Sequence, residues 1–428
     1  MTISYFSRIG SSNAYDKALQ NVSSRQSNLA ELQENLTSGK KVLRSSDDPT
    51  GAALAERALT RLNRVTADQR ALESQRNAIA TAESTLGEVT DRLQEFRELV
   101  IQAGNGSYSA AERGIIGKQL NSIREHILDL SNRNDSNGMP LFGGLGSGLN
   151  PFVGPSAMPA DYTYKGLPGQ NASTVNSIPY TLDGDSAFMF QAARDGIYNV
   201  KLADISGSGA ITAPRSLSTD SVTTINASLV TGSSFAIEIT SVGAGATAGT
   251  SSATYTVTET TSAGVIMPPS PNILVPDYPT SAPANITVTD MPGLSLTIKG
   301  TLAIGDTISV NPRPSIFSSL DDAIRDIGSA ANGNGSSQAI SQALTAIDAG
   351  LNRVMAVRGQ AGELLNRADR ITERNDKLNI ELEANRARAE DLDMVKGISD
   401  FQNQQTGYQA ALQSYAQVQK MSLFDYIR

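Results

Sequence analysis

The clearest hydrophobic pattern in the chain is a seven-residue repeat between residues 62 and 103. An apolar side chain returns at every seventh position, and in most repeats a second one follows three positions later. This spacing is typical of a helix whose apolar stripe packs against another helix. We therefore predict one helix of roughly 60 Å, at about 1.5 Å per residue. The first positions of the repeat are Val65, Leu72, Ile79, Leu86, Leu93 and Val100, and the second positions include Ala82, Val89, Phe96 and Ala103.

The last quarter of the chain carries a matching pattern. Residues 316–428 contain no proline, whereas 15 of the 17 prolines lie in residues 151–315. Proline inside a helix removes a hydrogen bond and clashes with the preceding turn, so its absence permits long helices. Apolar residues step by three and four from Ile340 to Leu378, and this spacing predicts a helix over 338–390. We expect the two long helices to pack antiparallel.

Two further amphipathic stretches lie at the ends of the chain. Residues 13–36 predict a helix that stops at Gly39, and residues 398–428 predict another, with seven glutamines and no charge over 402–419. We expect these arms to lack a partner within one molecule, and short isolated helices are marginally stable. They should become ordered only when they meet neighbouring subunits. The predicted assembly contacts are Leu19, Val22, Leu29, Leu36, Tyr408, Leu412, Tyr415, Met421 and Leu423.

Local signals mark two more helix starts. Asp48 suits an N-cap and Pro49 the first helical position. Ser109 and Glu112 form a capping-box pattern ahead of a third helix, and helices resume near Ser319 after the middle of the chain.

The middle of the chain has strand-like patterns. Threonine, serine, glycine and proline become frequent, and apolar residues alternate with polar ones in short runs. Such runs predict half-buried strands of an all-β insert. The proline-rich residues 264–284 predict a surface loop, and Gly143–Gly148 predicts a flexible hinge. The predicted strands lie within 235–239, 255–258, 286–289, 294–298 and 307–310.

These patterns predict an α+β multidomain chain. A long antiparallel coiled-coil bundle is formed by both termini, and the all-β insert lies between them. The expected segments are an N-terminal helical arm at 1–45, the N-terminal half of a helical rod at 46–145, the surface-exposed insert at 146–315, the C-terminal half of the rod at 316–396, and a C-terminal helical arm at 397–428.

Composition excludes several classes of protein. The 428 residues include no cysteine, which rules out disulfides and thiolate metal sites. The net charge of −8 disfavours nucleic acid as a partner, and residues 151–310 hold most of the excess acidity. No apolar run is long enough to span a membrane. Residues 1–10 lack the features of a cleavable signal peptide.

Candidate chemistry is weak. His126 is the only histidine, so no histidine partner is present for a metal or a base. Asp183–Asp185 resembles part of a calcium loop but lacks the later ligands, and a turn explains it better. The pairs at 47–48 and 321–322 are placed at predicted helix starts, where acidic residues are favourable. We therefore expect no enzyme activity, no cofactor and no metal.

Several motifs resemble a known family. Thr37–Asp48 (TSGKKVLRSSDD) followed by a proline, and Leu141–Gly144 (LFGG), resemble the amino-terminal part of flagellin-type proteins. Ala389–Met394 (AEDLDM), Tyr408–Leu412 (YQAAL) and Ser422–Tyr426 (SLFDY) resemble the carboxyl end. The form of these motifs is typical of the hook-associated protein 3 family, which joins the flagellar hook to the filament.

The resemblance implies a structural role in the bacterial flagellum. Both arms would pack together as coiled coils in the inner tube, within a ring of identical subunits. Hook-associated protein 1 would lie on one side and flagellin on the other. The chain would leave the cell through the flagellar type III export channel, with an export chaperone holding its carboxyl arm beforehand, and would end in the extracellular flagellum.

Two alternatives are open. The first is flagellin itself, although Ser46 and Pro49 and the ending Phe424–Arg428 depart from the usual flagellin pattern. The second is an insert that acts as an adhesin or binds glycans, which would need a concave aromatic patch. Core packing is the commoner explanation for the aromatic residues available, which are Tyr162, Tyr164, Tyr180, Phe188, Phe190 and Tyr198.

Overall fold

The computed structural model describes residues 11–146, 150–155, 161–203, 217–328 and 333–426, apart from the side chains of 11–15, 333–335 and 418–426. The chain forms two compact units. The terminal unit comprises the chain up to Arg70 together with residues from Thr372 onward, and the central unit comprises Ala71–Ile371. The helices are α1 Ser11–Ser38, α2 Pro49–Ala103, α3 Ala110–Ser131, α4 Gly184–Phe188, α5 Ala192–Asp195, the 3₁₀ turn η1 Ala227–Leu229, α6 Ile316–Gly328, α7 Gly333–Glu390 and α8 Met394–Tyr426.

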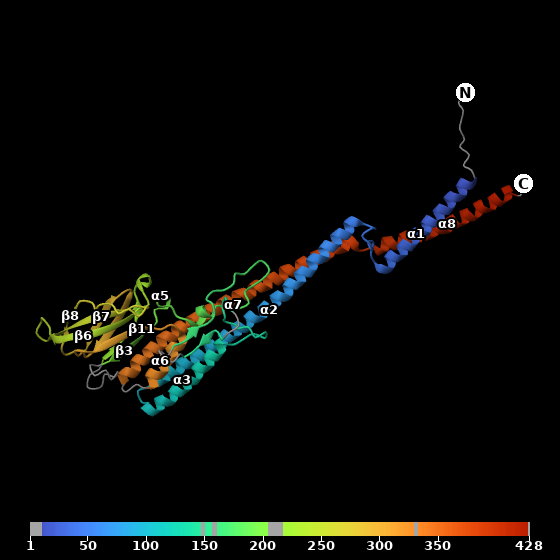
Figure 1. Ribbon diagram of the computed structural model, residues 1–428. Helices are drawn as coiled ribbons and strands as arrows, with labels where there is room; N and C mark the ends of the chain where they lie inside the picture. Colours follow the sequence, from blue (N-terminus) through green and yellow to red (C-terminus); the bar gives the residue numbers. More distant parts are fainter. Residues whose placement is uncertain (1–10, 147–149, 156–160, 204–216, 329–332, 427–428) are drawn as a thin grey trace, which may run out of the picture. The chain divides into compact units, whose positions relative to one another are not determined.

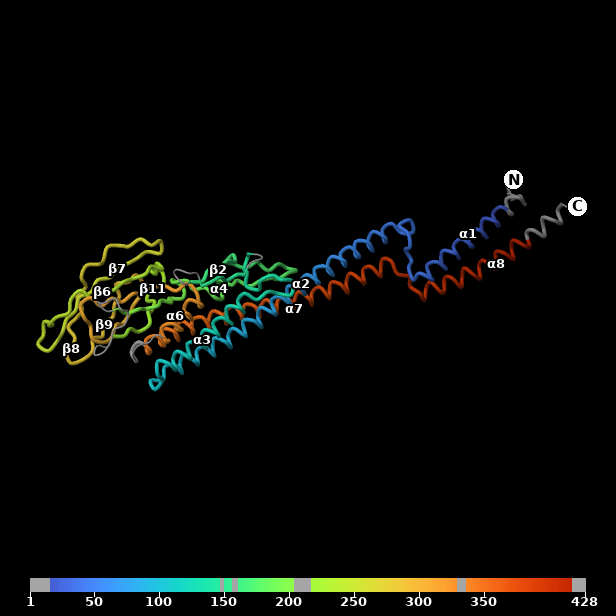
Figure 2. The backbone as a smooth tube through the Cα atoms, turned by 60° about the horizontal axis from the view of Figure 1, so that its bottom comes forward, coloured from blue at the N-terminus to red at the C-terminus, as the bar shows by residue number. Residues whose placement is uncertain are grey.

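Helices α2 and α7 run antiparallel within each unit (Figures 1 and 2). In the central unit, ion pairs join Arg76 to Asp369 at 3.0 Å and Arg97 to Asp348 at 2.9 Å. Residue numbers therefore rise along α2 as those of the paired residues on α7 fall. All ten named positions of the seven-residue repeat are buried, so the predicted antiparallel pair is confirmed.

The seam of the terminal unit differs from the predicted stripe at one position. Leu378 was placed on the apolar stripe, but its side chain is 38% exposed. The buried residues nearby on α7 are Asn375 and Leu382, and Val65 is buried on α2. The apolar stripe thus includes one buried polar residue, and a single asparagine in such a seam commonly fixes the register of paired helices.

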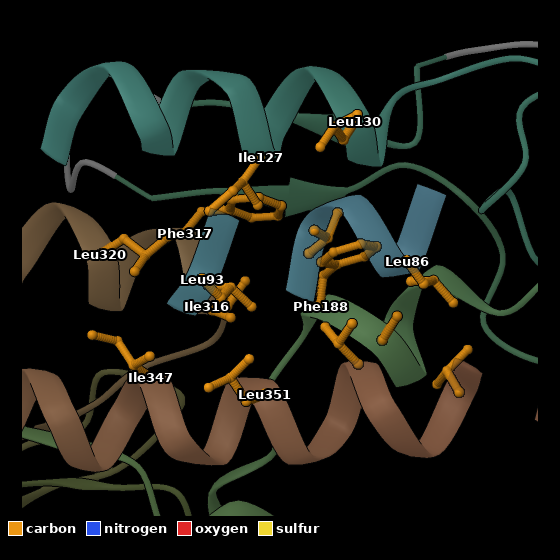
Figure 3. Packing of buried hydrophobic residues seen from close by; sticks show 14 of the residues in the cluster. Leu86, Leu93, Ile127, Leu130, Phe188, Ile316, Phe317, Leu320, Ile347 and Leu351 are labelled. Carbon is orange, nitrogen blue, oxygen red and sulfur yellow. The ribbon is translucent and has the colours of Figure 1, made fainter. Parts of the chain in front are cut away.

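The core of the central unit combines four helices with the segment that follows α3. Figure 3 shows Ile127 of α3 and Leu93 of α2 near Phe317 of α6, and Leu86 of α2 beside Phe188 of α4, within one cluster that also includes Leu351 of α7. The predicted capping box opens α3, because Ser109 and Glu112 each accept a backbone hydrogen bond from the other. Six aromatic side chains form a contiguous group in this core, namely Phe142, Phe152, Tyr162, Tyr164, Phe188 and Phe317.

The strands of the insert are β1 Phe152–Val153, β2 Thr163–Tyr164, β3 Tyr198–Ala203, β4 Leu217–Thr219, β5 Thr223–Thr224, β6 Ser234–Ala244, β7 Thr250–Thr260, β8 Ile273–Pro279, β9 Ala284–Met291, β10 Leu294–Gly300 and β11 Thr307–Pro312. The first two form a short antiparallel pair, and the others form two larger antiparallel sheets with a shared core of alternating side chains. The larger has the order β3-β11-β6-β7-β8, and the smaller has β4-β10-β5 with β9 also paired to β10. All five predicted strands are confirmed.

The prediction of a loop over residues 264–284 was wrong in part, because β8 lies within it. This strand pairs with β7 only and forms one edge of the larger sheet. Proline is tolerated in an edge strand, since the outer backbone groups need no partner strand. Pro276 and Pro279 therefore do not prevent strand pairing here.

Two further predictions were wrong. Gly143 and Gly144 are buried, and a side chain on Gly144 would collide with the carbonyl oxygen of Leu167. These glycines permit close packing in place of a flexible hinge, while residues 147 and 148 lie outside the description. The acidic pair at 321–322 lies inside α6, which begins at Ile316. It forms ion pairs with neighbouring arginines instead of capping the helix.

Candidate assembly surface

Two of the recognised motifs meet in the terminal unit, where α1 gives way to α2 and α7 gives way to α8. The Leu392 amide donates to the Gly39 carbonyl at 2.9 Å, and the Lys41 amide donates to the Glu390 carbonyl at 2.8 Å. We call this region, residues 39–48 with 390–393, the joint. The two motifs of the resemblance, at 37–48 and 389–394, thus have a shared structural reason: they hold two helix breaks against each other.

The backbone of the joint follows from its sequence. Gly39 has a φ of +70°, a left-handed conformation that favours glycine, and it ends α1 as predicted. The Asp48 side chain accepts from the Gly51 amide at 2.9 Å and from the Thr50 amide at 3.0 Å, which confirms the predicted N-cap of α2. Gly51 is buried because α2 passes close to the carbonyl of Ala389.

Charge also stabilises the joint. Lys40 pairs with Glu390, and the Lys41 ammonium donates to the Arg388 carbonyl at 2.8 Å. A cation at the last carbonyls of α7 opposes the negative end of that helix. Across the loop, the Arg44 amide lowers the pKa of Asp47, and the Gly51 amide lowers the pKa of Asp48. Both aspartates therefore hold these turns best when ionised.

Beyond the joint, α1 and α8 lie side by side (Figures 1 and 2). The expectation that the arms lack a partner within one molecule was therefore wrong: each arm pairs with the other, as the resemblance implied. Their contact is shallow: over Asp16–Ser38 no side chain is buried, and over Met394–Gln417 only Gly397 is buried. Arg25 crosses α8 at Gly407 and donates to Gln404 at 3.5 Å. The pair therefore lacks the closed core found between α2 and α7.

The apolar stripe of α8 divides into two rows with a seven-residue period. Phe401, Tyr408 and Tyr415 are half-buried beside α1. The second row contains Ile398, which is 47% exposed, the polar Gln405, and Leu412, which is 40% exposed. One row serves the α1–α8 contact, while the other faces away without a covering element among the described residues.

The nine predicted assembly contacts are distributed over both rows and the facing helix. Val22, Leu29 and Leu36 on α1 are half-buried, as are Tyr408 and Tyr415, while Leu19 and Leu412 are exposed. The side chains of Met421 and Leu423 lie outside the described residues. Their role in assembly stays a prediction. The hydrophobic pattern did not predict the joint as a site, although the two motifs of the resemblance cover both of its segments.

Other candidate groups have structural explanations. His126 is exposed on α3, and Asp183 caps α4 by accepting from the Asp185 amide at 3.1 Å. No cluster of three potential metal ligands occurs among the described side chains. Within the described part of the chain, none of the helices has the length and apolar character needed to cross a bilayer. Five of the six aromatic residues considered for a glycan patch belong to the hydrophobic cores, and Tyr180 is half-buried with its hydroxyl 2.8 Å from that of Ser74.

Comparison with known proteins agrees with this arrangement. The model of the bacterial flagellin N-terminal helical region matches residues 9–147, and that of the C-terminal helical region matches residues 344–427. Together these two regions make up just over half of the chain. The N-terminal match contains α1, α2 and α3, and the C-terminal match contains most of α7 and nearly all of α8.

Individual relatives are flagellar proteins. Flagellar hook-associated protein 3 of Salmonella typhimurium is 30% identical over 153 residues, which cover 34% of this chain and 46% of that protein. A flagellin of Clostridium tyrobutyricum is 28% identical over 134 residues, or 31% of this chain and 36% of that protein. The chain therefore spans less than half the length of these relatives.

The fold has a solved counterpart. Hook-associated protein 3 of Legionella pneumophila superposes with a TM-score of 0.59 at 20% identity, covering 77% of this chain and 97% of that one. At this level of identity the likeness concerns the fold. The paired terminal helices, their joint and the two matched helical regions together place the chain in the flagellin family of proteins.

Proposed function

We propose that this chain is a structural subunit of the bacterial flagellum that acts at the junction between hook and filament. The observation that carries the proposal is the shallow α1–α8 pair, in which no described side chain of α1 is buried while Ile398 and Leu412 of α8 are exposed. Helices without a closed core are marginally stable alone, which is typical of elements that pack against other proteins. The likeness to hook-associated protein 3 of Salmonella typhimurium supports the position at the junction.

Within this proposal the segments have different tasks. The arms, 1–45 and 397–428, insert between neighbouring subunits of a ring. The rod halves, 46–145 and 316–396, carry torque and bending stress through the α2–α7 seam, because close-packed interiors transmit strain. The insert, 146–315, faces the outside.

The proposed partners follow from the same position. Identical copies form the ring, hook-associated protein 1 lies on the hook side, and flagellin lies on the filament side. The chain reaches this position through the flagellar type III export channel, after an export chaperone has held its carboxyl arm. The role is mechanical, and no catalytic step is assigned to it.

Flagellin is the second candidate, because a flagellin also matches the terminal helices. The two functions predict opposite results when the gene is removed. Without a junction protein, flagellin is still exported but finds no platform, so it accumulates in the medium. Without flagellin, no filament protein is present to accumulate.

The experiment compares swimming, filaments and secreted flagellin in cells with and without this chain. The proposal predicts loss of swimming, bare hooks and abundant flagellin in the medium, all reversed by the full-length gene. A chain lacking residues 398–428 should not restore filaments. Normal filaments on cells that lack the chain, or on cells with the truncated chain, would refute the proposal.

A further inference from the structure

A groove opens beside the joint, between its loop and the first turns of α2. Its volume, open to solvent, is about 570 Å³, and a shallower neighbouring hollow of about 440 Å³ lies farther along α2, with Ala53 and Glu56 lining both. Its wall is mixed: Val42, Pro49 and Leu59 supply apolar surface, while Arg44, Arg386 and Glu390 supply charged groups. A groove of this mixed character can receive a helix that presents apolar side chains flanked by charged ones.

The same joint carries an apolar face on the first turn of α8. Met394, Val395 and Ile398 are 45%, 83% and 47% exposed. Gly397, within the same turn, is buried against Leu36 of α1. A valine that is four-fifths exposed beside two other apolar residues gains free energy when a partner covers it.

Charges around the two surfaces are complementary. Glu56, Arg57 and Arg61 lie at the rim of the groove and the adjoining hollow. Lys396 and Asp400 flank the apolar face of α8 and are exposed. No ion pair engages any of these five side chains within the described residues. An approaching acidic and basic pair would therefore find its counterparts free.

The groove and the apolar face of α8 also lie at the same end of the α2–α7 pair, next to the joint. The hydrogen bond from Leu392 to Gly39 ties the start of α8 to the loop that borders the groove. When two copies lie side by side with their joints next to each other, the apolar face of one copy can meet the groove of the next. A contact between two different surfaces repeats around a circle and closes into a ring when the rotation allows.

We propose that the α8 apolar face of one copy, Met394 to Ile398, inserts into the joint groove of a second copy. The inference rests on the proposed function, since it supplies the contact between adjacent subunits of the ring. A second copy is chosen as the occupant because one chain carries both surfaces with matching charge. In this contact Lys396 approaches Glu56, and Asp400 approaches Arg57 and Arg61.

The chain has no cysteine, so introduced cysteines give unambiguous cross-links. Cells are made to produce two full-length variants together, Ala53→Cys in the groove and Val395→Cys on the apolar face. Isolated flagella are treated with a short bismaleimide and probed for this chain. The inference predicts covalent dimers in the mixture and none with either variant alone. The control mixture, Ile380→Cys with Val395→Cys, should give none, because Ile380 is 68% exposed on α7 and does not line the groove.

The outcomes separate this inference from the proposed function. Absence of the unmodified chain from flagella would refute the function itself. Presence of the chain without the 53–395 cross-link would overturn the groove contact alone. Dimers from Val395→Cys alone, or a cross-link to a different flagellar protein, would show another geometry or another occupant and would equally overturn it.

A second measurement covers the case in which the cysteine variants are excluded from flagella. Val395→Asp places a charge in the groove and should reduce the chain recovered in flagella at least tenfold, with unchanged thermal unfolding of the free chain. Ile380→Asp is the matched control and should assemble normally. Equal recovery of both variants would contradict the inference.

Discussion

Replacing Leu412 with proline tests how weakly the arm is held in the free chain. Proline at this position removes the hydrogen bond between the amide of residue 412 and the carbonyl of residue 408, and its ring clashes with that carbonyl. The cost is about 3 kcal/mol or more in a helix interior. Among the described residues after 412, only Tyr415 is half-buried, and full burial of a large side chain yields about 1.5–3 kcal/mol. The free-energy cost of the proline therefore exceeds the stabilisation that the half-buried Tyr415 gives to the end of α8.

The expected result is local unwinding. The helical signal in circular dichroism should fall by the contribution of α8 from residue 412 onward. The core of the central unit does not include residue 412, so its free energy of unfolding should change by well under about 1 kcal/mol. A change of 1 kcal/mol shifts the midpoint of a large domain by roughly 2–4 °C, so the main thermal transition should move by less than about 2 °C. In cells, the variant should be exported but missing from isolated flagella, and filaments should not grow.

Leu412→Ala is the control, since alanine keeps the helix and removes only the exposed side chain. It should retain the full helical signal. Normal filaments on cells with Leu412→Pro would refute the reasoning. A fall of many degrees in the main transition would show that α8 belongs to the core of the molecule.

Three further predictions concern stability. Leu93→Ala removes a side chain with no exposed surface, so unfolding should become easier by about 3 kcal/mol in urea titrations, and an unchanged midpoint would contradict the packing. The pKa of Asp48 is lowered in the folded chain, so its contribution is present above its ordinary pKa of 3.8 and is lost as the pH falls through the folded value. Asp48→Ala should therefore flatten the acid dependence of unfolding, and an unaltered profile would refute the capping role. Burial raises the pKa of Asp321 despite the Tyr162 hydroxyl at 2.8 Å and Arg124 at 2.9 Å. Its folded pKa lies above the unfolded one, so wild type should gain stability relative to Asp321→Asn as the pH falls from 7 towards 4, and a relative loss would contradict this sign.

The long helices were predictable because their signals are local and repeated. The seven-residue spacing from Val65 to Val100 has only one regular structure that buries every member, and the structure buries all of them. The caps at Asp48 and Ser109 likewise depend on side chains within three residues of the helix start. Such features need no knowledge of the rest of the fold.

The remaining features depend on contacts between distant parts of the chain. On α8, the rows led by Ile398 and Phe401 form one broad stripe in the sequence, and only the position of α1 decides which row is covered. The joint groove is lined by α2, a loop and the end of α7, so no single stretch reveals it. β8 was missed because Pro276 reads as a strand breaker unless the strand is known to lie at an edge.

Hydrogen exchange of the two arms tests the central claim most directly. Amides of residues 16–38 and 398–417 are followed in the free full-length chain and in isolated flagella, with the α2–α7 seam as internal reference. The account predicts fast exchange of both arms in the free chain, because little burial opposes their opening, and strong protection in flagella. Arms of the free chain that are protected as well as the seam would contradict it.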